Sequence, residues 1–284
     1  MSAATRRLFH SLMLLHLLGS TFATAANIEV DLVFPRADAV YKPVWPFPVV
    51  FAVRNASQLW QDDKKSLPFW LKWDLYGFTD AEESGTGQLF SSGVWQTDSE
   101  ASRPPNGSFL VIDSSRKDLV NATQRHYRLR YTATLFGSCP VNTTDDSASA
   151  KDISNDNSTI FSIDPDAGQL PNFVDANACP TFISSLEITD TRTYRGTTCP
   201  VVASKSTAPD PCGLKMDESL SDKVKTAMLA RAECPNGTWP DPNGKLSSLS
   251  CNAARSEANA KLLGGLVANV SALVFILASS WTLL

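Results

Sequence analysis

The chain has 284 residues, with 25 lysines and arginines against 29 aspartates and glutamates. Between residues 26 and 252, the part that we expect to remain after processing, 21 basic and 28 acidic residues give a net charge of −7. An acidic surface repels the phosphates of nucleic acids, so this balance argues against a nucleic-acid-binding protein. The same part holds about 227 residues, enough for one to two domains with a hydrophobic core.

The first 25 residues have the pattern of a secretory signal peptide. Arg6 and Arg7 precede an apolar run over Leu12–Leu18, and the segment ends with the small residues Ala23-Thr24-Ala25. A segment of this kind is removed during export. We therefore expect residues 1–25 to be cleaved and the rest of the chain to fold in an oxidising compartment.

The stretch that follows, up to Gly137, contains no cysteine and predicts short β-strands. Apolar and polar residues alternate over Ile28–Phe34, which is typical of a half-buried strand. Phe47–Val53 is apolar on both faces, as in a strand that is covered on both sides. Gly, Pro, Asn and Asp separate these runs, as turns require.

Alternation returns over Leu67–Phe78 and from His126 to Leu135. Short strands without intervening helices favour two packed antiparallel sheets. We therefore predict a mostly β fold, an antiparallel immunoglobulin-like β-sandwich over residues 26–190. The polar stretch 138–158, rich in Ser, Thr, Asn and Asp, predicts an exposed loop within it, and strands are expected to resume at Thr159–Ile163.

Residues 191–252 are expected to form a cysteine-rich C-terminal region with one short helix. Apolar residues at helical spacing predict that helix over 220–231, with Ser219 as its N-cap and Asp222 completing a capping box. An even number of cysteines in a secreted chain favours three disulfides, although the sequence leaves fifteen pairings open. The six cysteines are Cys139, Cys179, Cys199, Cys212, Cys234 and Cys251.

The C-terminal tail has the layout of a glycosylphosphatidylinositol (GPI) attachment signal. Leu262–Leu284 carries no charge, and the small residues Asn252-Ala253-Ala254 lie upstream, separated from it by a spacer that ends at Lys261. In such signals the tail is removed when the lipid is attached. We expect attachment at Asn252, loss of residues 253–284, and display on the outer leaflet of the plasma membrane or, after transfer, in the cell wall.

Acceptor sites for N-linked glycans agree with this extracellular address. Glycan-bearing sequons of the form N-x-[ST] lie in surface turns of secreted proteins. The mature chain contains six of them, at Asn55, Asn106, Asn121, Asn142, Asn157 and Asn236.

The mature chain keeps one histidine, His126, which lies between Arg125 and Arg128 on the outward face of a predicted strand. A Ser-His-Asp or Cys-His site would have to use it, and a histidine-rich zinc or copper site would need more than one. No Gly-x-Ser-x-Gly turn, Gly-rich phosphate loop or calcium loop occurs in the sequence. The sequence therefore predicts no catalytic residue, no metal and no cofactor.

Aromatic and charged residues share the outward side of the strand predicted at Leu67–Phe78. Exposed aromatic rings can stack on sugar rings, and charged groups nearby can bond the sugar hydroxyls. The row that has this chemistry comprises Trp70, Lys72, Asp74 and Tyr76. Burial of Trp70 under a neighbouring loop is the competing interpretation, and Trp73 is expected in the core.

The segment Ile28-Glu29-Val30-Asp31-Leu32-Val33-Phe34-Pro35, followed by Pro48-Val49-Val50-Phe51-Ala52, resembles the opening of a family of secreted fungal proteins with a domain of unknown function. Members of that family often carry a GPI signal, a Trp-rich third strand and late cysteines. The resemblance implies a fungal surface glycoprotein and supplies no reaction.

Three functions agree with these features. The first is a non-catalytic structural or adhesive glycoprotein of the fungal cell surface, held by a GPI lipid. The second is a carbohydrate-binding module that contacts wall polysaccharide through Trp70 and Tyr76. The third is a wall-remodelling glycoside hydrolase, which needs two carboxyl groups about 5 to 9.5 Å apart; the sequence singles out no such pair.

Overall fold

The computed structural model describes the following residues: 27–62, 65–79, 87–97, 107–117, 119, 124–139, 151–174, 179–194, 197–203, 210–214, 216–234 and 237–240. The predicted signal peptide, Asn252 and the predicted attachment segment 253–284 lie outside them. Within this described part, no helix is both long and apolar enough to cross a membrane.

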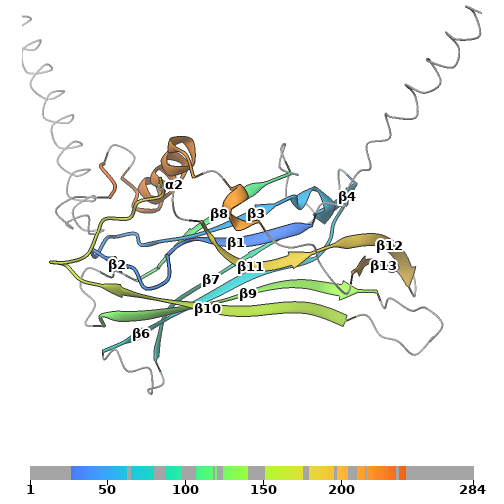
Figure 1. The fold of residues 1–284 in the computed structure, drawn as a ribbon, viewed down its shortest axis with the longest axis horizontal. Coiled ribbons are helices and arrows are strands. Elements are labelled where there is room, and N and C mark those ends of the chain that lie inside the picture. The colour runs from blue at the N-terminus through green and yellow to red at the C-terminus, as the bar shows by residue number, and fades with distance from the viewer. Residues whose placement is uncertain are drawn as a thin grey trace, which may run out of the picture.

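Two β-sheets pack face to face and form a sandwich (Figure 1). Sheet A has the strand order β11 (Thr181–Leu186), β1 (Ile28–Phe34), β3 (Pro48–Arg54) and β8 (Phe109–Ser114). Sheet B has the order β2 (Val40–Tyr41), β10 (Lys151–Ile163), β9 (His126–Ser138), β6 (Phe69–Phe78) and β7 (Gln88–Gln96). Neighbouring strands are antiparallel, apart from the short parallel pair of β2 and β10. The predicted mostly β sandwich is thus confirmed.

Smaller elements lie around this sandwich. Two hairpins pair β4 (Trp60–Asp62) with β5 (Lys65–Ser66), and β12 (Ile188–Tyr194) with β13 (Thr197–Val202). Among the described residues, the helical elements are two short 3-10 turns, η1 (Ala56–Leu59) and η2 (Pro211–Gly213), and one α-helix, α2 (Glu218–Arg231).

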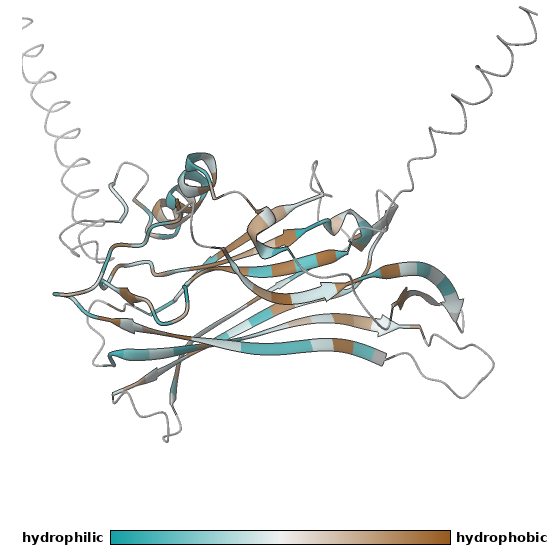
Figure 2. Cartoon of the chain, in the orientation of Figure 1, coloured by the Kyte–Doolittle hydropathy of each residue, from teal (hydrophilic) through white to brown (hydrophobic). Residues whose placement is uncertain are grey.

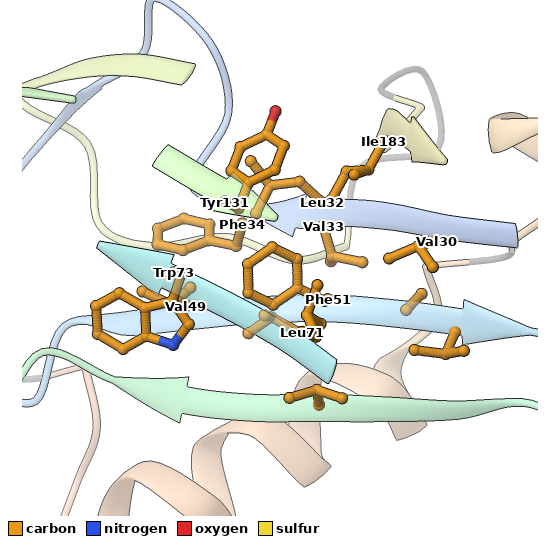
Figure 3. Packing of buried hydrophobic residues seen from close by; sticks show 14 of the residues in the cluster. Val30, Leu32, Val33, Phe34, Val49, Phe51, Leu71, Trp73, Tyr131 and Ile183 are labelled. Carbon is orange, nitrogen blue, oxygen red and sulfur yellow. The ribbon is translucent and has the colours of Figure 1, made fainter. Parts of the chain in front are cut away.

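Large apolar side chains fill the space between the sheets (Figure 3). Phe51 of β3 and Tyr131 of β9 meet edge to face across this space, with ring centroids 5.9 Å apart. Leu71 and Trp73 of β6 are also buried, as the alternation along Phe69–Phe78 predicts. The burial of Trp73, which is 2% exposed, confirms the prediction made from sequence.

Helix α2 packs against β3 and β8 on the outer side of sheet A, and so adds a third layer over part of that sheet (Figure 1). Leu220, Val224 and Met228 belong to the same hydrophobic cluster as the sandwich core. Trp239, further along the chain, joins that cluster and donates a hydrogen bond to the backbone oxygen of Pro46 at 3.1 Å. The predicted boundary at residue 190 falls inside β12 (Ile188–Tyr194).

Strand β1 differs from its prediction as a half-buried strand, because both of its faces are buried. Its outward carboxylates, Glu29 and Asp31, lie under the C-terminal layer and form ion pairs with Arg54 of β3. The Arg54 guanidinium contacts Asp31 Oδ2 at 2.9 Å. Buried charges are stable only when they are paired in this way. The alternation is therefore present, but its polar side faces an ionic cluster and not water.

The predicted exposed loop over 138–158 is wrong at both of its ends. Ser138 is the last residue of β9, and residues 151–158 form the first part of β10, which pairs with β9 in antiparallel register. The middle of that stretch, residues 140–150, lies outside the described residues. Figure 2 shows β10 as hydrophilic through its middle, which is why its sequence has the composition of a loop.

The helix also begins earlier than predicted. Asp217, and not Ser219, is the N-cap: its side chain accepts a hydrogen bond from the backbone N–H of Leu220 at 2.9 Å. Ser219 lies inside the first turn. Both residue types cap helices well, so composition alone does not decide between them.

Two disulfides join the C-terminal region to the sandwich. Cys139, at the end of β9, is bonded to Cys199 of β13, and Cys179, just before β11, is bonded to Cys212 of η2. Cys234 is disulfide-bonded as well, while Cys251 lies outside the described residues.

Candidate carbohydrate-binding face

Strand β6 places all four residues of the predicted row on the outward face of sheet B. Its burial alternates along Phe69–Phe78, with every second side chain directed into the core. Trp70, Lys72, Asp74 and Tyr76 occupy the other positions. We call these four residues, together with Phe136 and Arg130 of β9, the β6–β9 face.

The aromatic end of the β6–β9 face is formed by Trp70 and Phe136. Their rings meet edge to face with centroids 4.7 Å apart, and Trp70 remains 43% exposed. On the neighbouring strand β7, Val94 pairs with Lys72 and is 57% exposed. The interpretation of Trp70 as covered by a loop is therefore not what the structure shows: the indole is held in place by one neighbour and open to solvent.

An ion pair occupies the centre of the face. Lys72 Nζ lies 3.1 Å from Asp74 Oδ2, and the two side chains are 58% and 22% exposed. An exposed pair of this kind adds little to stability. It does, however, present a cluster of hydrogen-bond donors and acceptors about two residues along the strand from the open indole.

Tyr76 is arranged differently from Trp70. The guanidinium of Arg130 lies over its ring, 5.2 Å from the ring centroid. Arg128 stands in the same way over Phe78, at 5.5 Å. The cation therefore covers one face of the Tyr76 ring, so that face does not offer the stacking surface that the sequence predicted.

Hydroxyl groups continue the face across β9 and β10. Thr132 pairs with Lys72 and Thr134 with Trp70 in the register of β9 and β6. Thr134 Oγ1 lies 3.1 Å from Ser154 Oγ of β10. The outward side of sheet B thus combines an exposed indole, an ion pair and short hydroxyl side chains, which is the chemistry that sugar rings and their hydroxyls require.

His126 lies at the other end of the same sheet face. Its Nδ1 is 3.0 Å from Ser162 Oγ, its cross-strand partner on β10. A hollow of about 520 Å³ adjoins these residues and is also lined by Arg125 and Asp164. Asp164 accepts hydrogen bonds from the backbone N–H groups of Ala167 and Asp166, which lower the pKa of its carboxyl.

The Asp164 carboxylate therefore fixes a turn at the edge of this hollow. In the part of the chain that the structure describes, no group of three or more His, Cys, Asp and Glu side chains is placed to hold a metal ion.

Sequence reasoning missed Phe136 and Arg130 as members of the face. Extending the alternation of β9 by one step beyond Leu135 would have placed Phe136 outward, and the direct pairing of Arg130 with Asp74 follows only from the register. Of the six sequons, Asn55 and Asn157 lie among the described residues, and both are exposed. Asn106, Asn121, Asn142 and Asn236 lie outside them.

Comparison with known proteins gives a family and no further relative. The model of a family described as a domain of unknown function, DUF7136, matches residues 23–243. No curated protein and no solved structure matches the chain. Because the matched residues span the whole sandwich and its C-terminal layer, this chain belongs to the DUF7136 family.

Proposed function

We propose that the protein is a non-catalytic, GPI-anchored glycoprotein of the fungal cell surface that adheres to wall polysaccharide through the β6–β9 face. The observation that carries this proposal is the solvent exposure of Trp70. The indole is 43% exposed on the outward face of sheet B, whereas α2 packs against β3 and β8 on the outward face of sheet A. Single exposed apolar residues are common, but an exposed tryptophan beside a second aromatic ring and an ion pair marks an interaction site.

Carbohydrate is the partner that this chemistry fits best. An indole offers a rigid apolar surface for the C–H groups of a sugar ring, and it loses little conformational entropy on binding. The edge-to-face contact with Phe136 fixes the orientation of the indole before any ligand arrives. Lys72 and Asp74 can then donate to and accept from the ring hydroxyls.

A glycoside hydrolase has less support from the same geometry. Asp74 is the carboxylate of the row, and it is ion-paired with Lys72 on an open sheet face. A catalytic acid requires a raised pKa and a second carboxyl group across a bound sugar. The β6–β9 face supplies an ion pair in place of two opposed carboxyls.

Binding to insoluble β-glucan and to chitin tests the proposal. The secreted protein should co-sediment with at least one of these polymers, and Trp70→Ala should weaken that binding at least about tenfold, as expected when a central aromatic contact is lost. Val174→Ser is the matched control, because Val174 is also an exposed apolar residue, at 40%, and lies outside the β6–β9 face. It should bind like the wild type.

A second variant tests the face without removing a ring. Thr132→Asn creates a sequon with Thr134, and so places a glycan beside Lys72. We expect this glycan to block binding. The proposed role of the face would be contradicted if the wild type did not bind either polymer at millimolar sugar concentration. It would also be contradicted if Trp70→Ala bound as tightly as the wild type.

The anchor is tested separately. Phosphatidylinositol-specific phospholipase should release the protein from intact cells, and replacing Asn252 with a bulky residue should prevent attachment. Retention of the protein with Leu284 still present would disprove the anchor without bearing on the binding face.

A further inference from the structure

Strand β10 is a long edge of sheet B. Its pairing with β9 runs from Lys151 to Ser162, whereas its pairing with β2, on the other side, is confined to Ser162 and Ile163. Among the described residues, no strand pairs with Lys151–Thr159 on that second side, whereas the backbone oxygen of Ile160 accepts a hydrogen bond from the N–H of Asp38 at 2.8 Å. An edge of about ten residues is long enough to template pairing with another chain.

The central residues of β10 leave the register of such pairing open, although the strand also carries the charged residues Lys151, Asp152 and Asp156. Ser154–Ser158 is polar on both faces, and Figure 2 shows the hydrophilic stretch in the middle of the strand. When one face of a strand is buried, hydrophobic alternation fixes its register, and a strand that is polar on both faces lacks this control. A second copy of the chain could therefore pair with β10 in several registers.

Asn157 lies in the middle of this edge. It pairs with Tyr131, whose side chain is buried, so Asn157 is on the side of β10 that faces sheet A. Two residues earlier, Asn155 Nδ2 donates to Ser184 Oγ of β11 at 2.7 Å and joins the edges of the two sheets. Asn157 is nevertheless exposed, so its side chain emerges at the seam between β10 and β11.

The amide of Asn157 is oriented for modification. Its Oδ1 accepts a hydrogen bond from the backbone N–H of Ser158 at 2.7 Å, so the nitrogen that carries an N-glycan points away from the strand's own backbone. Asn157-Ser158-Thr159 is a complete sequon. At the other described sequon, Asn55 Nδ2 instead donates to the backbone oxygen of Asn27 at 3.0 Å.

We propose that an N-glycan on Asn157 covers the β10 edge and prevents it from pairing with a second copy of this chain. A glycan is bulky and strongly hydrated, and a position at the seam of two edge strands puts it in the path of an approaching strand. Its role is distinct from binding by the β6–β9 face, because Asn157 lies on the opposite side of the β10 backbone from that face.

The full chain, secreted from a fungal host, provides the test. Glycopeptide mass spectrometry should find sugar on Asn157, and light scattering after gel filtration should find a monomer. Asn157→Gln removes the glycan and should shift the protein to dimers and larger species at the same concentration. Asn157→Lys also removes it but should stay monomeric, because a lysine on an edge strand itself opposes pairing.

Two controls keep the result specific. Ser57→Ala removes the sequon at Asn55 without touching the edge, and this variant should remain monomeric. If Asn157→Gln is not secreted, the folded wild type is treated with an endoglycosidase that leaves one N-acetylglucosamine on each asparagine, because an amidase would convert Asn157 to a charged aspartate; Asn157→Lys treated in the same way is the monomeric reference. An unmodified Asn157 in the secreted protein, or a glycan-free edge that stays monomeric, would overturn the proposal.

Discussion

Trp73 Nε1 donates a hydrogen bond to Asp113 Oδ2 at 3.0 Å, and this contact joins sheet B to the edge strand of sheet A. Trp73 belongs to β6 in sheet B, and Asp113 to β8 at the edge of sheet A. The second oxygen of the same carboxylate lies 2.7 Å from Arg231 of α2. One aspartate therefore connects all three layers, and it satisfies the polar atom of a tryptophan that is otherwise buried in the core.

Replacing Asp113 should destabilise the protein more than replacing Arg231 does, because Asp113 also accepts the hydrogen bond of the buried Trp73 indole. Asp113→Ala leaves the indole N–H without an acceptor, and we expect a loss of about 2–3 kcal/mol in the free energy of unfolding. Arg231→Ala removes only the exposed ion pair and should cost no more than about 1 kcal/mol. Denaturant unfolding of both variants measures the difference; equal losses would show that the Trp73 contact contributes nothing.

Gly93 of β7 is required at the same junction. A Cβ atom at this position would lie closer to Asp113 Oδ2 and to Trp73 Nε1 than a van der Waals contact permits. Gly93→Ala should therefore displace one of the two groups and destabilise the protein by about 1–3 kcal/mol. Ser92→Ala, at the next position on the same strand, serves as the control and should be close to neutral. A wild-type melting temperature for Gly93→Ala would refute the packing argument.

The strands that are predicted best from the sequence are those with one solvent-exposed face and one buried face. Phe69–Phe78 alternates because its two sides meet water and core, and period-two reasoning needs nothing else. The same reasoning fails for β1, because Asp31 is paired with Arg54 of the neighbouring strand, and Gly213 of η2, far along the chain, lies beside that guanidinium. It fails for β10 for the opposite reason: this edge strand is held by backbone pairing to β9 and has few apolar residues to reveal it.

The candidate site was likewise predictable from the sequence only in part. The outward placement of Trp70, Lys72, Asp74 and Tyr76 follows from alternation along one strand. The stacking of Arg130 on Tyr76 depends on which residue of β9 stands opposite, and register between strands so far apart in the chain is a tertiary property.

Asp31 makes stability depend on pH. Burial raises the pKa of its carboxyl to about 6, against the opposing attraction of Arg54. Its Oδ1 is buried and has no hydrogen-bond partner among the described residues, which disfavours the charged form further. Since the pKa in the unfolded chain is 3.8, the folded protein binds this proton more tightly between these two values. The resulting stabilisation is complete below the unfolded pKa and is lost as the pH rises through about 6.

Asp31→Asn tests this dependence. The variant has no carboxyl to titrate, so the stability of the wild type relative to Asp31→Asn should rise by about 2 kcal/mol between pH 7 and pH 4. Chemical denaturation of both proteins at each pH provides the measurement, and the comparison cancels the titration of the other carboxylates. A difference that is constant over this range, or that falls toward acid pH, would exclude Asp31 as the source.

The two described disulfides should differ in which layer they hold. Cys139–Cys199 closes a span of 60 residues and Cys179–Cys212 one of 33, so the loss of either should cost about 4 kcal/mol by the chain-entropy estimate. In the Cys139→Ser/Cys199→Ser variant, hydrogen exchange should accelerate first in the β12–β13 hairpin, because Cys199 lies in β13. In Cys179→Ser/Cys212→Ser it should accelerate first around η2 and the acidic groups paired with Arg54.

The strands β3 and β6 carry no cysteine and should keep their protection under mild reduction. Loss of protection in these strands together with the hairpin would mean that the cysteines secure the whole sandwich and not only its C-terminal layer.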